Sequence, residues 1–101
     1  MDIVWIRAQV RKGDYELTSH ADEERQADQI SIEEIEQAML NAEILETYRD
    51  DPRGPSCLML GYGREGYPIH LVCGQTPSKT LRIITVYIPT PPRWIDPKTR
   101  G

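Results

Sequence analysis

Hydrophobic positions recur at two different spacings along the chain. In the first half they return about every 3.6 residues, which indicates amphipathic helices. Beyond residue 43 they form short runs with period-two alternation, which is typical of β-strands. The pattern predicts helices over 3–12, 20–28 and 32–41, and strands over 44–48, 57–62, 68–74 and 81–88.

Capping residues mark the ends of the predicted helices. Asp2 and Ser19 suit the N-cap positions of the first two helices, and Gly13 suits the left-handed residue that ends the first. Ser31 and Glu34 have the spacing of a capping box, in which each side chain bonds the backbone amide of the other residue. The third helix is therefore expected to begin directly after Ser31.

Short turn-rich connections between the predicted strands imply an antiparallel meander, because parallel strands need long crossovers. We expect an α+β fold in which two to three N-terminal helices pack on one face of a C-terminal four-stranded antiparallel sheet. Residues 15–17 are interpreted as a short extended link. Residues 1–90 are expected to form a single domain, and residues 91–101 a Pro-rich, basic C-terminal tail in extended conformation.

Composition narrows the class of protein. No apolar run reaches the roughly 18 residues of a membrane span, and the chain begins Met-Asp-Ile without the basic start of a signal peptide. Two cysteines, Cys57 and Cys73, are too few for a secreted disulfide framework, so both are expected to be reduced thiols. These features predict a cytoplasmic protein without membrane contact.

Charge is distributed unevenly along the chain. Residues 1–51 carry 14 acids and 5 bases, a balance of −9, whereas residues 52–101 carry 2 acids and 7 bases, a balance of +5. A basic half can attract nucleic acid locally even in an acidic protein. The asymmetry is equally explained by glutamate-rich helix surfaces, and both interpretations stay open.

The two histidines are the first candidates for acid–base chemistry. His20 begins a predicted helix, where Glu24 one turn later can orient its ring and Arg25 supplies a cation. Alternation places His70 with Val72 on the sheet face that the helices leave open, where a histidine suits proton transfer. The plainer alternatives are a helix-start residue bonded to nearby backbone and a solvated strand residue.

Other candidates lie in the last strand and the tail. Tyr87 shares a face with Thr85, with Arg82 on the other face, and can hold a phosphate, donate a proton or pack across strands. Arg93 beside Trp94 suits phosphate pairing and base stacking, or a protein partner. The RNA-binding candidates are Arg53, Thr85, Arg93 and Trp94.

No metal or other cofactor is expected. A zinc site would need His20, both cysteines and His70, but residues 70 and 73 of one strand point to opposite faces. A small-molecule ligand is not expected either, because the chain contains no phosphate-binding glycine loop and no other strong ligand motif.

Several short motifs in a fixed order resemble a widespread bacterial family of small, largely uncharacterised domains. They are LTSHA at 17–21 with Glu24 and Arg25, ISIEEI at 30–35, PRGPSC at 52–57, PIHLV at 68–72 and RIITVY at 82–87. Many members of that family carry an arginine at the position of Glu24 and another at that of Asp28. The resemblance implies a RelE/barnase-like ribonuclease fold and the toxin role in a type II toxin–antitoxin pair, with a zinc-finger antitoxin as partner.

These observations lead to one main functional expectation and two rivals. The main one is a metal-independent endoribonuclease that cleaves RNA, free or on the ribosome, through the 2′-hydroxyl. His20 and His70 would be base and acid, Tyr87 a second proton donor, and the cation would be one of three arginines: Arg25, Arg53 or Arg93. The first rival is a non-catalytic module that recruits the product of the neighbouring gene. The second, a metal-dependent nuclease, is disfavoured because the acids lie on helices.

Overall fold

The computed structural model describes residues 1–101 as one α+β unit with its elements in a mixed order along the chain. The helices are α1 (Ile3–Lys12), α2 (Ser19–Ala27), α3 (Ile32–Asn41) and a short 3-10 turn, η1 (Arg64–Gly66). The strands are β1 (Tyr15–Leu17), β2 (Glu43–Tyr48), β3 (Ser56–Tyr62), β4 (Pro68–Gln75), β5 (Leu81–Tyr87), β6 (Trp94–Asp96) and β7 (Thr99–Arg100). The α+β class is confirmed.

The main sheet has five strands in the order β1-β5-β4-β3-β2. Strands β2 to β5 pair in antiparallel fashion, as expected, whereas β1 lies parallel to β5 with Leu17 opposite Ile83. The expected four-stranded antiparallel sheet is therefore corrected to a five-stranded mixed sheet. The sequence does not reveal a strand over residues 15–17, because three residues are too few to display a strand's periodicity.

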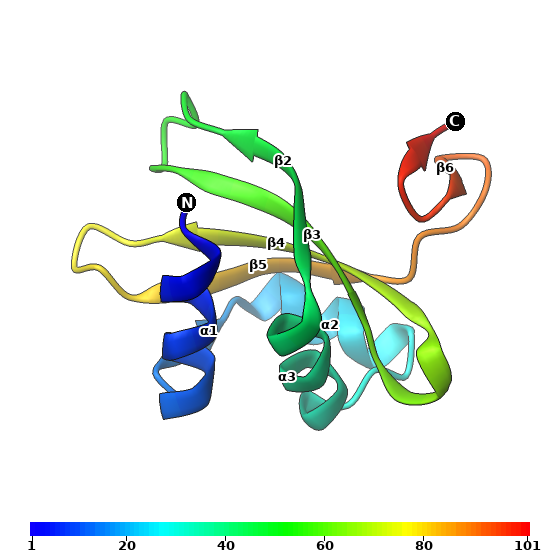
Figure 1. Cartoon of the computed structure of the whole chain (residues 1–101), viewed down its shortest axis with the longest axis horizontal. Helices are drawn as coiled ribbons and strands as arrows, with labels where there is room; N and C mark the ends of the chain where they lie inside the picture. The colour runs from blue at the N-terminus through cyan, green and yellow to red at the C-terminus, as the bar shows by residue number, and fades with distance from the viewer.

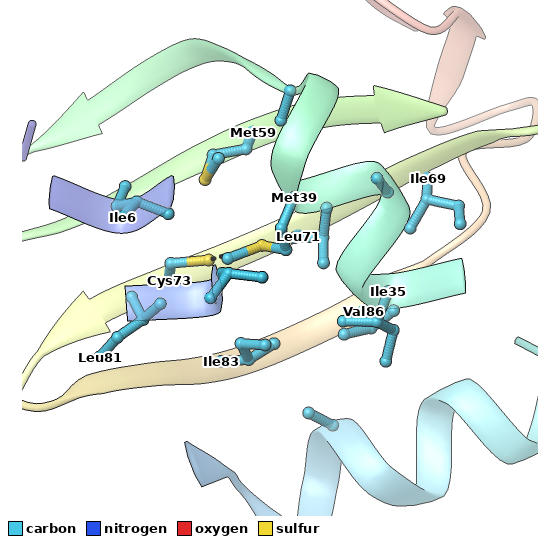
Figure 2. Close-up of a cluster of buried hydrophobic side chains, with 14 of the residues drawn as sticks. Ile6, Ile35, Met39, Met59, Ile69, Leu71, Cys73, Leu81, Ile83 and Val86 are labelled. Carbon is cyan, nitrogen blue, oxygen red and sulfur yellow. Dashed lines mark hydrogen bonds between the residues drawn. The ribbon is translucent and has the colours of Figure 1, made fainter. Parts of the chain in front are cut away.

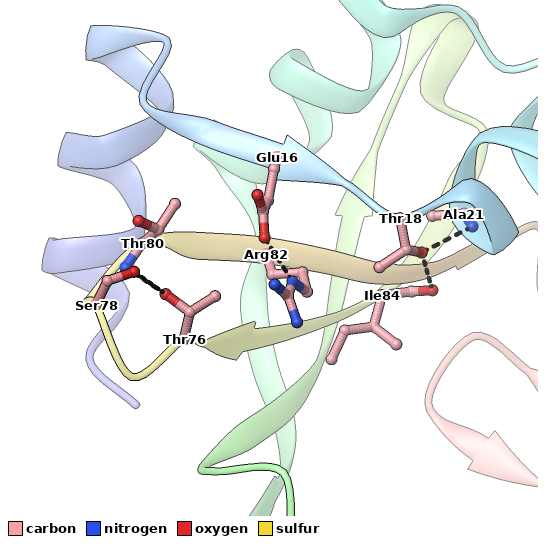
Figure 3. A network of polar contacts seen from close by, with 8 residues as sticks. All are labelled: Glu16, Thr18, Ala21, Thr76, Ser78, Thr80, Arg82 and Ile84. Atoms are coloured by element: carbon pink, nitrogen blue, oxygen red, sulfur yellow. Dashed lines mark hydrogen bonds and ion pairs between the residues drawn. The ribbon is translucent and has the colours of Figure 1, made fainter.

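The helix caps explain where the helices begin. The Ser31–Glu34 capping box is present, and Gly13 ends α1 in the left-handed conformation, so both predictions are confirmed. Helix α2, however, is capped by Thr18 and not by Ser19. The Thr18 hydroxyl accepts a hydrogen bond from the Ala21 amide and donates one to the Ile84 carbonyl of β5 (Figure 3). The start of α2 is thereby fixed to the sheet.

The three helices cover one face of the sheet (Figure 1) and enclose the main hydrophobic core. Figure 2 shows side chains from α3 interleaved with those of the central strands, among them Met39, Leu71 and Ile83. The contact between α3 and β3 is close at Gly61, where a Cβ atom would lie 2.1 Å from the Ala38 carbonyl oxygen. None of the helices combines the length and the apolar character that crossing a bilayer would require.

A bulge in β5 changes which side chains share the other face of the sheet. Val72 pairs with Thr85, but Cys73 pairs with Ile83, so Ile84 is an extra residue in β5. As a result Arg82, which pairs with Gly74, lies on the same face as Thr85 and not on the opposite one as expected from simple alternation.

The C-terminal segment folds back over this second face instead of extending away from it. Strands β6 and β7 form a small antiparallel hairpin (Figure 1), and Trp94 is only 2 % exposed. Leu58 and Leu60 point to the same face and are also buried, apart from the main core. The expectation of an extended tail is therefore corrected. A single buried tryptophan anchors this segment, and its prolines interrupt any hydrophobic periodicity that would have revealed the hairpin in the sequence. We call residues 94–100 the C-terminal hairpin.

Candidate functional site

The exposed half of the candidate site is a histidine–carboxylate pair on α2. His20 Nε2 lies 3.2 Å from Glu24 Oε1, and the His20 side chain is 66 % exposed. The same Glu24 oxygen accepts the Val86 amide of β5 at 3.0 Å. The two nitrogens therefore lie at most 6.2 Å apart, the sum of these two distances, which places the imidazole beside the second half of β5. The expected orientation of His20 by Glu24 is confirmed.

The buried half of the site is centred on His70. Its register opposite Tyr87 puts it on the sheet face away from the helices, as predicted. It is nevertheless fully buried, and the expectation of a solvent-exposed histidine is corrected. The reason is the C-terminal hairpin, whose Trp94 ring meets the imidazole edge to face, with ring centroids 4.4 Å apart.

The hydrogen bonds of His70 fix its tautomer. Its Nε2 lies 2.7 Å from the Pro97 carbonyl oxygen, and its Nδ1 lies 3.0 Å from the Tyr87 hydroxyl. Burial lowers the pKa of His70, so the ring is neutral at pH 7. Because a carbonyl oxygen can only accept, Nε2 carries the proton and Nδ1 accepts from the Tyr87 hydroxyl. Burial also raises the pKa of Tyr87, which keeps this phenol protonated.

The C-terminal hairpin is fastened over His70 by charged groups of β2. Arg100 donates two hydrogen bonds to the Glu46 carboxylate, at 2.6 and 3.0 Å, and its guanidinium lies over the Trp94 ring, 4.6 Å from the centroid. The Tyr48 hydroxyl donates to the same carboxylate. These bonds, led by those from Arg100, lower the pKa of Glu46 to about 2. A second, more exposed pair joins Lys98 to Glu43.

Tyr87 links the two halves of the site. Its hydroxyl contacts His70, and its charge environment includes Glu24 from the α2 side and Arg93 and Arg100 from the C-terminal side. Thr85 lies two residues earlier on the same sheet face and is partly exposed. His70, Tyr87 and Thr85 thus share one face of the sheet, and Arg93 contributes to the charge environment of Tyr87. His20 contacts Glu24 at the edge of β5.

Three other predicted residues are placed differently. Arg25 is bonded to Asp22 and to the Ile30 carbonyl, so it supports the end of α2 rather than the site. Arg53 lies in the loop before β3, near the Gly74 end of β4, and therefore at the far end of the open face from His70. Trp94 is buried against His70, which leaves its ring unavailable for base stacking.

The carboxylates of α2 have a structural role that sequence reasoning missed. Beyond β1, the edge of β5 has no neighbouring strand, and Glu24 and Asp28 accept its Val86 and Ile88 amides instead. These side chains substitute for a strand at an otherwise open edge. Acidic residues at these two positions therefore stabilise the edge of β5 by accepting hydrogen bonds from its backbone amides.

Sequence reasoning also missed the contribution of Glu46, Tyr48 and Arg100. They come from strands separated by more than fifty residues, and only the folding-back of the tail brings them together. No spacing in the sequence signals such a contact. No group of three or more histidine, cysteine, aspartate or glutamate side chains is arranged to hold a metal ion.

The fold and the site together define a small α+β domain in which His70 and Tyr87 lie on the sheet face away from the helices and the C-terminal hairpin covers His70. A family model described as "Domain of unknown function (DUF4258)" matches residues 17–88, which include His20, His70 and Tyr87 but end before the C-terminal hairpin. The chain belongs to this DUF4258 family. No curated protein and no solved structure matches the chain.

Proposed function

We propose that this chain is a metal-independent endoribonuclease that acts as the toxin of a type II toxin–antitoxin pair. The observation that carries the proposal is the placement of an accessible histidine–carboxylate pair, His20 with Glu24, beside the strand that presents a second proton-transfer pair, Tyr87 with His70. Cleavage through the 2′-hydroxyl of RNA needs one group that removes a proton and one that supplies a proton.

In this mechanism His20 is the general base. Its Nε2–H points to Glu24, so Nδ1 is free to take the proton of a 2′-hydroxyl. The 2′-oxygen then attacks the adjacent phosphorus, the bond from phosphorus to the 5′-oxygen breaks, and a 2′,3′-cyclic phosphate forms. The negative charge that develops on the phosphate oxygens needs a nearby cation. Arg93 lies six residues beyond the end of β5 and takes this role in place of Arg25 and Arg53, because its charge acts on Tyr87.

Tyr87 is the general acid that protonates the departing 5′-oxygen. Its raised pKa keeps the proton on the phenol at neutral pH, and the hydrogen bond to His70 Nδ1 holds the hydroxyl in place before the reaction. A phenol has a single proton, so the O–H bond turns from Nδ1 to the departing oxygen for the transfer, and Tyr87 then regains a proton from solvent. His70 is thus a positioning residue, because burial prevents it from touching RNA. Within this proposal the fold is RelE-like, the protein acts in the cytoplasm on free or ribosome-bound RNA, and a zinc-finger antitoxin restrains it.

A second function, a non-catalytic module that recruits the neighbouring gene product, is favoured by one observation. Both ring nitrogens of His70 are bonded within the protein, and the hairpin covers the ring. A cluster that only stabilises the fold would have the same hydrogen bonds and the same burial. In that case His20 would be an ordinary surface residue, and its replacement would leave every function unchanged.

Induced expression in a bacterial host separates the two functions. The proposal predicts growth arrest by the wild type, relief by His20→Gln and by Tyr87→Phe, and rescue by co-expression of the neighbouring gene. Glu23→Gln is the matched control, because Glu23 is exposed on the same helix and its side chain forms no hydrogen bond or ion pair. Arrest that persists in both His20→Gln and Tyr87→Phe would contradict the mechanism, and binding to the neighbour's product without arrest would favour the recruiting module.

A further inference from the structure

A polar pocket lies at the other end of the sheet face that carries Tyr87. It is formed by the loop before β3, the end of β4 and the beginning of β5. Ile84 is its single hydrophobic lining residue. The pocket is lined by two arginines, Arg53 and Arg82, by one carboxylate, Asp51, and by uncharged polar side chains that include Ser56, Gln75 and Thr76.

Two arginines on separate elements give the pocket its positive groups. The Arg82 Nε donates to Glu16 at 2.6 Å (Figure 3), and Arg53 donates to both oxygens of Asp51 at 3.3 Å. A guanidinium has five N–H donors, so both arginines keep donors beyond these bonds. The side chains of Arg53 and Arg82 are 76 % and 48 % exposed, so an anion from solution can reach the donors that remain.

Local backbone features keep this pocket open and direct Arg82 toward it. The bulge at Ile84 brings Arg82 onto the open face, directly opposite Gly74. A Cβ atom at Gly74 would lie 3.0 Å from the Ile84 side chain. Gly54 has a φ of +112°, which side chains rarely tolerate, and a Cβ there would lie 3.2 Å from the Gln75 carbonyl oxygen. Larger residues at either position would crowd the pocket.

We propose that this pocket binds a backbone phosphate of the RNA substrate, away from the bond that is cleaved. The inference builds on the proposed ribonuclease function and assigns a role to Arg82, which had none. Arg82 and Tyr87 are five residues apart on β5, or about 16 Å at roughly 3.3 Å per residue. The single phosphate of a dinucleotide cannot occupy both places, so the pocket holds a phosphate of a longer RNA, beyond the nucleotides at the cleavage site.

Binding of uncleavable RNA tests the inference separately from cleavage. Fluorescence anisotropy would compare an eight-nucleotide 2′-O-methyl RNA with a dinucleotide of the same chemistry, and inorganic phosphate would be added as a competitor. The variants are Arg82→Gln and Arg53→Gln. Arg64→Gln is the matched control, because the Arg64 side chain is 74 % exposed and paired with Glu34, but lies outside this pocket.

The long RNA should lose about tenfold in affinity in each pocket variant and none in the control. The plot of log affinity against log salt should become shallower by about 0.7 for each arginine removed, as expected for one lost phosphate contact on a single strand. Dinucleotide binding should not change. Glu16→Gln should strengthen long-RNA binding, because it removes the carboxylate that competes for Arg82.

Several results would overturn the inference. They are unchanged long-RNA affinity in Arg82→Gln, equal losses in Arg64→Gln, and Arg82-dependent binding of inorganic phosphate without any preference for the long RNA. The inference can fail while the proposed function stands, which would appear as normal dinucleotide cleavage in a protein whose pocket does not affect RNA binding. If the wild type neither binds nor cleaves RNA of any length, the proposed function itself is wrong.

Discussion

Replacing Glu46 by glutamine should loosen the C-terminal hairpin that covers His70. The carboxylate accepts both hydrogen bonds of Arg100 and that of Tyr48, and a glutamine carries no charge and offers only one acceptor atom. The pKa of Glu46 falls from its usual 4.5 to about 2. A tenfold change in proton affinity corresponds to about 1.4 kcal/mol, so these contacts are worth at most about 3.5 kcal/mol.

The realised stabilisation is smaller because water screens the pair. The side chains of Arg100 and Glu46 are 55 % and 34 % exposed, which lowers the expected cost of Glu46→Gln to about 1 kcal/mol. The sign of the pH dependence follows from the lowered pKa. The stabilisation is fully present above pH 4.5 and is lost as the pH falls through about 2, below which Glu46 is protonated in both states.

Trp94 reports directly on this docking. In a Trp5→Phe background it is the only tryptophan, and it is buried only while the hairpin is docked. At pH 7, quenching of its fluorescence by acrylamide should reveal an undocked fraction about fivefold larger in Glu46→Gln, which corresponds to about 1 kcal/mol. The control Glu43→Gln removes an exposed ion pair with Lys98 and should leave the undocked fraction of the hairpin almost unchanged. Equal quenching in Glu46→Gln and Glu43→Gln, or a difference between Glu46→Gln and the parent protein that is as large at pH 2 as at pH 7, would refute the reasoning.

Three further predictions concern the fold itself. Gly61→Ala should destabilise the protein by about 2–3 kcal/mol in urea denaturation, because its Cβ would collide with the Ala38 carbonyl. In the control Gly66→Ala the new Cβ has free space, and only the positive φ should lower the stability, by about 1 kcal/mol. Equal losses of stability in the two variants would be inconsistent with close packing at Gly61. Asp28→Ala should speed hydrogen exchange at the Ile88 amide, its hydrogen-bond partner, and leave the Leu71 amide of the central strand β4 unaffected. In the native protein, Cys57 should react slowly with iodoacetamide at pH 8, because burial raises its pKa to about 11. Rapid labelling of Cys57 in the folded protein, detected by mass spectrometry, would contradict its burial.

The sequence was informative where a residue's role depends on its near neighbours. The Ser31–Glu34 capping box and the left-handed Gly13 are set within a few positions, and both were predicted correctly. The four strands of the meander were found within one or two residues because each repeats an alternating pattern next to a turn. The parallel strand β1 was missed because its stability comes from β5, more than sixty residues away.

In the candidate site, too, the sequence predicted relationships between near neighbours but not contacts between distant parts of the chain. Orientation of His20 by Glu24 is a one-turn relationship, and the sequence predicted it. Burial of His70 depends on Trp94 and on the anchoring of Arg100 by Glu46, which are contacts across the whole chain. Alternation also misplaced Arg82, because a single bulge residue reverses the face of every residue beyond it.

The most direct test of the central claim is cleavage of a defined RNA by the purified protein in the presence of a metal chelator. We expect the wild type to produce a 2′,3′-cyclic phosphate and to lose activity when the attacking 2′-hydroxyl is replaced by hydrogen, with a loss of 10²- to 10⁴-fold in His20→Gln. Cleavage that tolerates the 2′-deoxy substitution, or that His20→Gln carries out at the wild-type rate, would contradict the account.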